Sequence, residues 1–290
     1  MNGQRSQRLA FWAQEDRLWA IFWITGVVAL WLWDLAFLNR PAFTLLQTAL
    51  FNTLVGGIMV VVFTIVLGWS VALALTTLEQ RSNPLPFLSL TFLLNLIRSV
   101  PQMVGILFGY VILTFFIERE ALQNTFWQIV WMSFTVSLFT FLELVDVIRE
   151  RIAFYRRSDF FNAMLCSGIS EQRIINVDIL WKNSRAHILQ KLVATFGMAV
   201  FLQCSVDFII SVGLSTDVSL SNFPATLGGL LATLDSKQDI LAISMLFTDA
   251  GYIGNLFFRH LQGMSVAFLI IFTLICVFRT SNGLVKRYKL

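Results

Sequence analysis

Five ionisable side chains in or beside the apolar stretches of this chain are of types that could do chemistry inside a membrane. A charged group in lipid is costly, so such residues usually pair with one another, carry protons or line a path for a solute. They are Asp34, Arg98, Glu143, Asp146 and Asp207. Asp34 lies at the outer end of its apolar stretch, and Glu143 and Asp146 are followed within a turn or so by two arginines, at positions 149 and 151. We expect these three acids to form interfacial ion pairs.

Three residues, Arg98, Pro101 and Asp207, are candidates for a pathway or gate. We expect Arg98 at the cytoplasmic start of a membrane-spanning helix, within reach of the polar loop that follows Arg149. Pro101 should kink that helix, because proline removes a backbone N–H and clashes with the preceding turn. Asp207 is expected to face the pathway or its outer gate.

Residues that would indicate catalysis, cofactor binding or metal binding do not form such a pattern. His187 and His260 are far apart and have no metal-ligand company, and the three cysteines, Cys166, Cys204 and Cys276, show no spacing of a metal site or redox pair. A phosphate-binding loop of the Gly-x-x-x-x-Gly-Lys-Ser type is missing too. We therefore expect no catalytic, cofactor or metal site, and an intramembrane enzyme is poorly supported.

The composition is that of an integral membrane protein. Hydrophobic residues make up 57% and charged residues 13% of the 290 residues, whereas an ordinary soluble domain has roughly a quarter charged residues. No charged residue occurs from Pro41 to Leu78, and about 20 apolar residues suffice to cross a bilayer. Since backbone groups in lipid must be satisfied within their own segment, we expect an all-α polytopic fold.

Six apolar windows predict six spanning helices, which position the candidate residues. The windows run over Leu18–Leu38, Asn52–Leu78, Leu90–Ile117, Thr125–Ile148, Leu189–Val212 and Gln262–Phe278. With the N-terminus inside, sixteen lysines and arginines fall in cytoplasmic segments and only four, Arg40, Arg119, Lys237 and Arg259, fall outside. The positive-inside bias thus predicts that both termini are cytoplasmic. It also explains the net charge of +4 without nucleic-acid binding.

Glycines recur in the second and third windows and predict close helix packing. They are Gly56, Gly57, Gly68, Gly105 and Gly109. Small residues four apart let two helices approach each other closely in lipid. We expect these glycines to contact neighbouring helices and not a ligand.

Outside the spanning helices, three polar segments divide the chain. Residues 1–17 are expected to form a cytoplasmic interfacial segment, and residues 18–290 the transmembrane domain. Within that domain, a cytoplasmic loop covers about 149–191 and an extracytoplasmic loop about 214–261. Loops of this length are usually functional.

The cytoplasmic loop contains a sequence that predicts two short helices joined at a glycine. Ser158 or Asp159 can act as the N-cap of the first helix, which Gly168 ends. Ser170 with Glu171 then begins a second helix with an apolar side. That side consists of Ile174, Ile175, Val177, Ile179 and Leu180. Two helices meeting at a glycine predict a rigid elbow, from Asp159 to Asn183, between the fourth and fifth spans.

The elbow resembles the cytoplasmic signature of permease subunits in binding-protein-dependent ABC importers. That signature is a Glu-Ala-Ala motif followed by a glycine and then by Ile-x-Leu-Pro. Here the alanine is Ala163, the glycine is Gly168 and the leucine is Leu180. The likeness is greatest to the second permease of dipeptide, oligopeptide and nickel importers, whose loop also carries Asp-Tyr-Val and Arg-Ile-Ile, compared with Asp159-Phe160-Phe161 and Arg173-Ile174-Ile175 here. It covers roughly residues 50–290 and is weaker around Arg98–Pro101 and Asp207–Gly213.

Four positions depart from the family pattern. They are Asn162 for Glu, Met164 for the second Ala, Asp178 for His and Trp181 for Pro. In the family the glutamate helps to fix the elbow and its contact with the ATPase. The resemblance therefore implies a degenerate coupling helix, which a partner permease with a fuller signature could compensate.

The resemblance implies a function in transport. The chain would form half of the translocation pathway for a peptide, a peptide-like solute or a chelated metal, in a bacterial-type inner membrane. Its partners would be a second permease, two ATP-binding subunits that hold ATP and Mg²⁺, and an extracytoplasmic solute-binding protein. The residues expected to couple to the ATPase are Asp159, Phe160, Phe161, Asn162, Ala163, Met164, Leu165, Gly168 and Arg173.

Two other classes of function stay open at this point. An ion-coupled secondary transporter would use Asp207 and Glu143 as proton carriers, although such folds usually show internal repeats or broken helices at the membrane midplane. No internal repeat is visible in this sequence. A non-transporting membrane scaffold derived from a permease would fit the eroded signature.

Overall fold

The computed structural model of the chain is all-helical over the residues that it describes, which are 15–213, 223–233, 244–245, 247–254, 258 and 261–288. The predicted all-α fold is thus confirmed for this part of the chain. Most of the predicted N-terminal segment, most of the predicted outer loop and His260 lie outside the described residues.

The helices follow one another without a strand between them in the described ranges. They are α2 (Glu15–Phe37), α3 (Arg40–Glu79), α4 (Leu85–Ser99), α5 (Gln102–Glu118), α6 (Thr125–Arg156), α7 (Asp159–Cys166), α8 (Glu171–Arg173), the π-helix η1 (Ile174–Asn183), α9 (Arg185–Gly213), α10 (Leu227–Thr233), the 3-10 turn η3 (Ala250–Tyr252) and α13 (Leu261–Tyr288).

Five of these helices, α2, α3, α6, α9 and α13, are long and apolar enough to cross a membrane. The number rises to six if the bent pair α4 and α5 is one broken span. Several helices extend well beyond the predicted windows. At 1.5 Å per residue, the 40 residues of α3 measure about 60 Å, roughly twice the hydrocarbon thickness of a bilayer. The chain is therefore a membrane-embedded helical bundle, and its longest helix is longer than one bilayer crossing requires.

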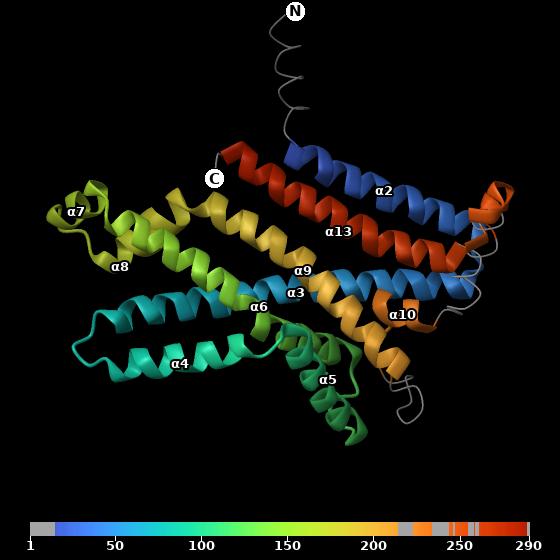
Figure 1. The fold of residues 1–290 in the computed structure, drawn as a ribbon, viewed down its shortest axis with the longest axis horizontal. Helices are drawn as coiled ribbons and strands as arrows, with labels where there is room; N and C mark the ends of the chain where they lie inside the picture. The colour runs from blue at the N-terminus through green and yellow to red at the C-terminus, as the bar shows by residue number, and fades with distance from the viewer. Residues whose placement is uncertain are drawn as a thin grey trace, which may run out of the picture.

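The third predicted span is broken at Pro101. Val100, directly before the proline, is extended (φ −85°, ψ 126°), and α4 and α5 meet at 93°. A residue before proline is pushed out of the helical region by the proline ring. The predicted kink is confirmed, but the expectation of one continuous helix over Leu90–Ile117 is wrong: α5 leaves the bundle sideways, as Figure 1 shows.

Close contacts at glycines hold the central helices together, as predicted. In α5, a Cβ at Gly105 would overlap the Phe139 ring of α6, and one at Gly109 would overlap Thr135 of the same helix. In α3, Gly57 lies against Phe196 and Gly68 against Leu144. α3 packs mainly on α6, whereas α13 packs on α2 and α9.

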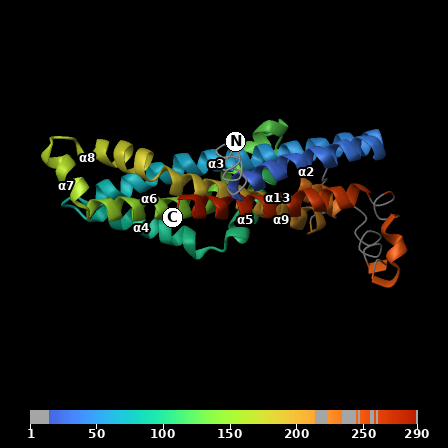
Figure 2. The same cartoon turned by 90° about the horizontal axis from the view of Figure 1, so that it is seen from above.

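The molecule is elongated, with different structures at its two ends. α7 and α8 lie at one end, and α10 lies toward the other, as Figures 1 and 2 both show. α3 and α6 both reach the α7 and α8 end (Figure 1). A partner that contacts α7 and α8 would therefore lie next to the ends of the two long helices α3 and α6.

Candidate functional site

The first half of the predicted elbow is the helix α7. α6 ends at Arg156, and Ser158 occupies the N-cap position with an extended backbone (φ −94°, ψ 151°). Its hydroxyl does not cap α7, because Oγ donates back to the carbonyl of Tyr155 at 2.6 Å. The predicted helix from Asp159 to Cys166 is confirmed, but its beginning is set by the turn and not by a side-chain cap.

Gly168 ends α7 with a left-handed backbone, φ +77°. Its N–H donates to Leu165 O at 2.9 Å, and the N–H of Ile169 donates to Met164 O at 3.2 Å. A Cβ at this position would meet nothing within 4 Å, so space does not require glycine here. The positive φ does, because it strains any residue with a side chain.

The second half of the elbow differs from the ordinary helix that the sequence predicts. After the single turn of α8, the chain forms the ten-residue π-helix η1. Ile174, Ile175, Ile179 and Leu180 are buried as predicted, whereas Val177 is exposed. Helical stretches of the π type are rare and often occur at functional sites.

A continuous apolar core attaches the elbow to the bundle. Phe161 of α7 and Ile174, Ile179 and Leu180 of η1 belong to one buried cluster that also contains residues of α3, α4, α6 and α9. Met164 and Ile169 pack against the same cluster. The elbow is therefore a packed extension of the bundle and not a loosely attached loop.

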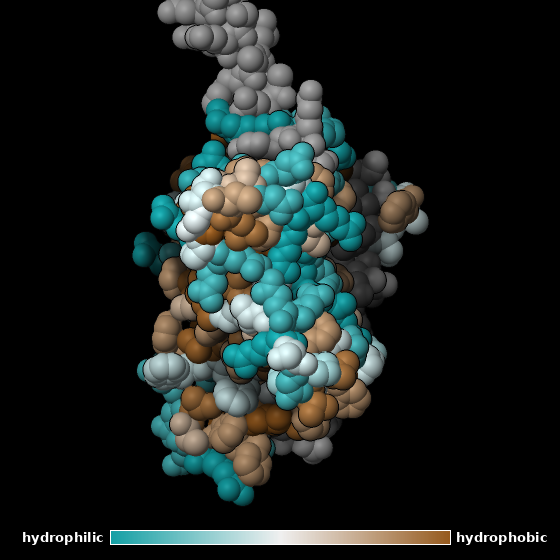
Figure 3. All heavy atoms as spheres, turned by 90° about the vertical axis from the view of Figure 1, so that its left-hand side faces the viewer, coloured by the Kyte–Doolittle hydropathy of each residue, from teal (hydrophilic) through white to brown (hydrophobic). Residues whose placement is uncertain are grey.

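The predicted coupling residues divide between the two sides of α7. Phe161 faces the core and Met164 is half-buried, so the expectation that Phe161 contacts the ATPase directly is wrong. Phe160 (38% exposed) and Leu165 (40% exposed) face outward. Exposed residues next to them on the elbow are Asp159, Asn162, Ala163 and Arg173. The end face of the molecule accordingly mixes hydrophilic and hydrophobic patches, as Figure 3 shows.

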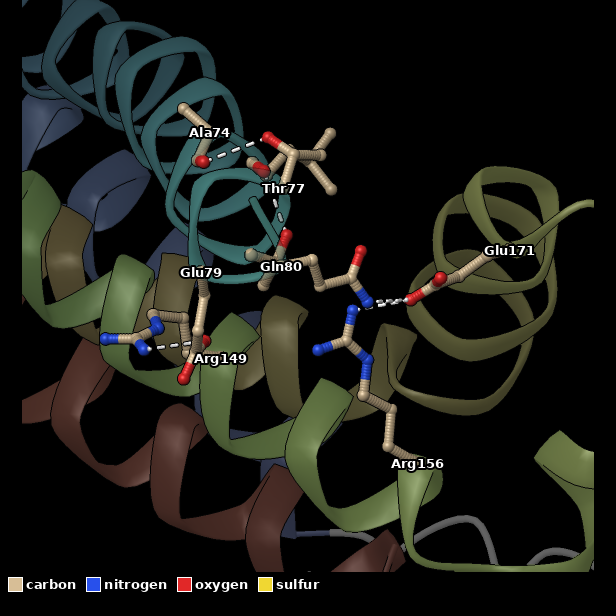
Figure 4. A network of polar contacts seen from close by, with 9 residues as sticks. Ala74, Thr77, Glu79, Gln80, Arg149, Arg156 and Glu171 are labelled. Carbon is tan, nitrogen blue, oxygen red and sulfur yellow. Dashed lines mark hydrogen bonds and ion pairs between the residues drawn. The ribbon is translucent and has the colours of Figure 1, made fainter. Parts of the chain in front are cut away.

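One carboxylate connects the elbow to both long helices. Glu171 Oε1 accepts from an Arg156 NH2 group at 2.6 Å and from Gln80 Nε2 at 2.8 Å, and Figure 4 shows the three side chains meeting. Arg156 ends α6 and Gln80 directly follows α3. Sequence reasoning treated Glu171 only as part of a helix start, because nothing in one sequence indicates a partner 91 positions away.

The acids predicted to pair at the membrane interface do so with other partners. Asp146 bonds to Arg98 and Glu143 to Lys191, both at 2.5 Å. These contacts join different helices, because the side chains point toward neighbouring elements and not along α6. The expected pairing with nearby arginines is therefore wrong, and so is the expectation of Arg98 at the start of a span, since Arg98 lies in the last turn of α4.

The arginines expected as partners bind elsewhere. Arg149 bonds to Glu79 at 3.3 Å, and Arg151 lies near Ser184 and the Tyr155 ring. Asp34 forms no ion pair with a described residue. It is buried, and its Oδ1 accepts from the Ser265 hydroxyl at 2.6 Å. Within the described residues, Asp34 is therefore a buried hydrogen-bond acceptor, and its predicted interfacial ion pair stays a prediction.

Among the pathway candidates, Pro101 precedes α5, and Asp207 is buried on α9 beside Tyr110 and Thr226. No group of three or more His, Cys, Asp or Glu residues that could hold a metal occurs among the described residues. No protein-family model matches the chain, and no curated protein is significantly similar to it. The resemblance to importer permeases therefore rests on the sequence alone, chiefly on the residues of the elbow.

Proposed function

We propose that the chain is a permease subunit of an ATP-binding-cassette importer, whose elbow docks on an ATPase subunit. The observation that carries this proposal is the attachment of the elbow. It has an outward-facing side with Phe160 and Leu165, and an inward side that is continuous with the core of α3 and α6. A segment of this kind can transmit a push from a partner to the bundle without chemistry in this chain.

The contact surface combines apolar and basic side chains. Phe160 and Leu165 would enter an apolar groove on the ATPase, while the exposed Arg157 and Arg173 would make polar contacts at its rim. Phe161 contributes from behind by holding α7 on the core. Asn162, which stands where the family has a glutamate, is exposed next to this surface. The carboxylate of Glu171 would take over the role of that glutamate in fixing the elbow, through its bonds to Arg156 and Gln80.

The remaining components belong to the partners. ATP and Mg²⁺ would bind to the two ATP-binding subunits, whose closure would move the elbow together with the ends of α3 and α6. A second permease would complete the pathway, and an extracytoplasmic binding protein would deliver a peptide or peptide-like solute. The complex would lie in a bacterial-type inner membrane, with both termini of this chain cytoplasmic.

The two rival classes are less well supported. A secondary transporter with Glu143 as a proton carrier would need that carboxylate free, whereas it is ion-paired with Lys191. A non-transporting scaffold would not need an elbow of defined shape, which the left-handed backbone of Gly168 produces between α7 and α8. We therefore place the importer permease ahead of both.

Copurification and two variants test the proposal. The chain should purify with a second permease and an ATPase pair; a stable lone monomer that takes up solute with protons would contradict the proposal. In the complex, Gly168→Pro cannot adopt φ +77° and loses the N–H bonded to Leu165. It should abolish transport while ATP hydrolysis continues, and Arg173→Glu should weaken ATPase attachment.

Gln172→Ala is the matched control, because Gln172 is exposed in the same turn. It should leave transport unchanged. Normal transport by both Gly168→Pro and Arg173→Glu would show that the elbow is not the coupling element.

A further inference from the structure

Among the buried side-chain atoms that have no hydrogen-bond partner within the described residues, three lie in one region of the bundle. They are Tyr110 Oη, Gln203 Oε1 and Asp207 Oδ2. The residues are 1%, 4% and 6% exposed. Leaving one such group unpaired costs roughly 1–3 kcal/mol, and more for a charged group. Three in one region call for a physical explanation.

The three side chains belong to one junction of helices. Gln203 and Asp207 are one turn apart on α9 and so share a face. Asp207 lies close enough to the hydroxyls of Tyr110 on α5 and Thr226 before α10 to interact with them. Even so, Tyr110 Oη and Asp207 Oδ2 complete no bond of acceptable geometry. We call Tyr110, Gln203, Asp207 and Thr226 the Asp207 cluster.

Bonds of their own hold the surrounding elements in place. Asn52 Nδ2 on α3 donates to Ala225 O at 2.8 Å, and the N–H of Leu227 donates to Thr53 Oγ1 at 3.0 Å. Gly228 lies directly against the backbone of Cys204, where no Cβ would fit. Segment 225–229 is thus fixed on α3 and α9 independently of Asp207, so the unpaired oxygens are not the result of a loose loop.

The cluster contains one carboxyl group, Asp207, and no basic residue lies near it in the sequence of the helices that carry or contact the cluster. Lysine and arginine are missing from 41–78 of α3, from α5, from 192–213 of α9 and from α10. The other titratable groups that face Asp207 are Tyr110 on α5 and Cys204 on α9, both neutral acids. The helices α3 and α10 contribute only amide and hydroxyl groups. Among the described residues, nothing balances the carboxylate.

We propose that the Asp207 cluster binds a monovalent cation. All its available atoms are oxygens (carboxylate, amide carbonyl, phenol and hydroxyl), which are the ligands that hard cations prefer. A single positive charge neutralises the single carboxylate, whereas a divalent ion would leave an uncompensated charge in the apolar interior. The ion links α9 to α5 and to segment 225–229. A proton on the carboxyl is the alternative that the experiment separates from a bound cation, and the inference does not depend on the importer proposal.

Thermal unfolding of the full chain in lipid nanodiscs tests this site. Sodium chloride is titrated against choline chloride at constant ionic strength, and pH is varied in a separate sodium-free series. Sodium should raise the midpoint of unfolding by about 5 °C at saturation, with one radioactive sodium bound per chain. A midpoint that rises only as the pH falls, with no response to sodium, would mean that a proton neutralises the carboxyl instead and would overturn the proposal. Asp207→Asn, which keeps the shape without the charge, should abolish the response to sodium.

Two further variants keep the test decisive if Asp207→Asn folds poorly. Tyr110→Phe removes one oxygen ligand and should weaken the response to sodium about tenfold. Asp34→Asn is the control for the sodium series, because Asp34 is equally buried but already bonded to Ser265, and it should respond to sodium like the wild type. A wild-type protein that does not respond to sodium, or a response to sodium that survives in Asp207→Asn, would overturn the proposal.

Discussion

The elbow and the Asp207 cluster are polar regions of the same bundle, and they differ in how completely their carboxyl groups are hydrogen-bonded. In the elbow, Glu171 receives two donors from two helices. In the cluster, Asp207 has an oxygen without any donor, although it is more deeply buried. A carboxylate with complete bonds fixes the position of an element, whereas one with incomplete bonds indicates a place where something else binds.

The two regions also differ in what surrounds the charge. The elbow combines its ion pair with a large apolar cluster. Packing already stabilises the elbow, and the ion pair fixes its orientation on the bundle. Segment 225–229 is attached mainly by single hydrogen bonds and by contact with the α9 backbone. We therefore expect core substitutions to have the largest effect at the elbow and steric substitutions to have the largest effect at α10.

The largest expected effect is at the elbow core. Ile179 is 0% exposed and Trp181, two residues later, is 72% exposed. Ile179→Ala should lower the free energy of unfolding by roughly 2–5 kcal/mol, measured by denaturant titration in mixed micelles. Trp181→Ala should change it by less than about 0.5 kcal/mol. Equal effects would mean that η1 is not packed as described.

A steric substitution at α10 should be the next largest. Gly228→Ala forces a Cβ into the backbone of Cys204 and should cost about 1–3 kcal/mol in the same measurement. Gly229→Ala is the neighbouring control, since its Cβ would lie 3.3 Å from Thr226 Oγ1 and 3.5 Å from Ser211 Oγ. It should cost clearly less. A harmless Gly228→Ala would show that α10 is free to move away from α9.

The Glu171 attachment should have a smaller effect. Glu171→Gln keeps the shape but removes the charge that Arg156 and Gln80 share, and it should cost about 1 kcal/mol. The loss should be local, so hydrogen exchange should accelerate in α7 and α8 while the core of α6 stays protected. Uniform acceleration across the bundle would contradict a role confined to the elbow.

The ion pair between Arg98 and Asp146 should contribute least. Both side chains are about half exposed, and exposed pairs typically contribute about 0.2–1 kcal/mol. A double-mutant cycle with Arg98→Ala and Asp146→Ala should give a coupling energy in this range. A larger coupling would place the pair in a less polar environment than its exposure indicates.

Sequence periodicity was most informative where local rules dominate. Five of the six apolar windows predicted long apolar helices, the glycines predicted helix contacts, and Gly168 predicted the end of α7, because each depends mainly on the chain within a few residues. The same reasoning gave wrong partners for Glu143 and Asp146. Each acid had possible basic partners both nearby in the sequence and on other helices. Only the packing of neighbouring helices decides that Glu143 pairs with Lys191 and Asp146 with Arg98.

By itself, the sequence determined an all-helical, membrane-embedded chain with a polar segment in which a short helix ends at Gly168, since hydrophobicity and backbone preference are local properties. Only the tertiary structure decided that Phe161 faces inward, that Glu171 joins α3 and α6, and that one oxygen of Asp207 has no donor among the described residues. Each of these facts joins residues distant in the chain. Their energies depend on which surfaces meet, and one sequence does not specify that.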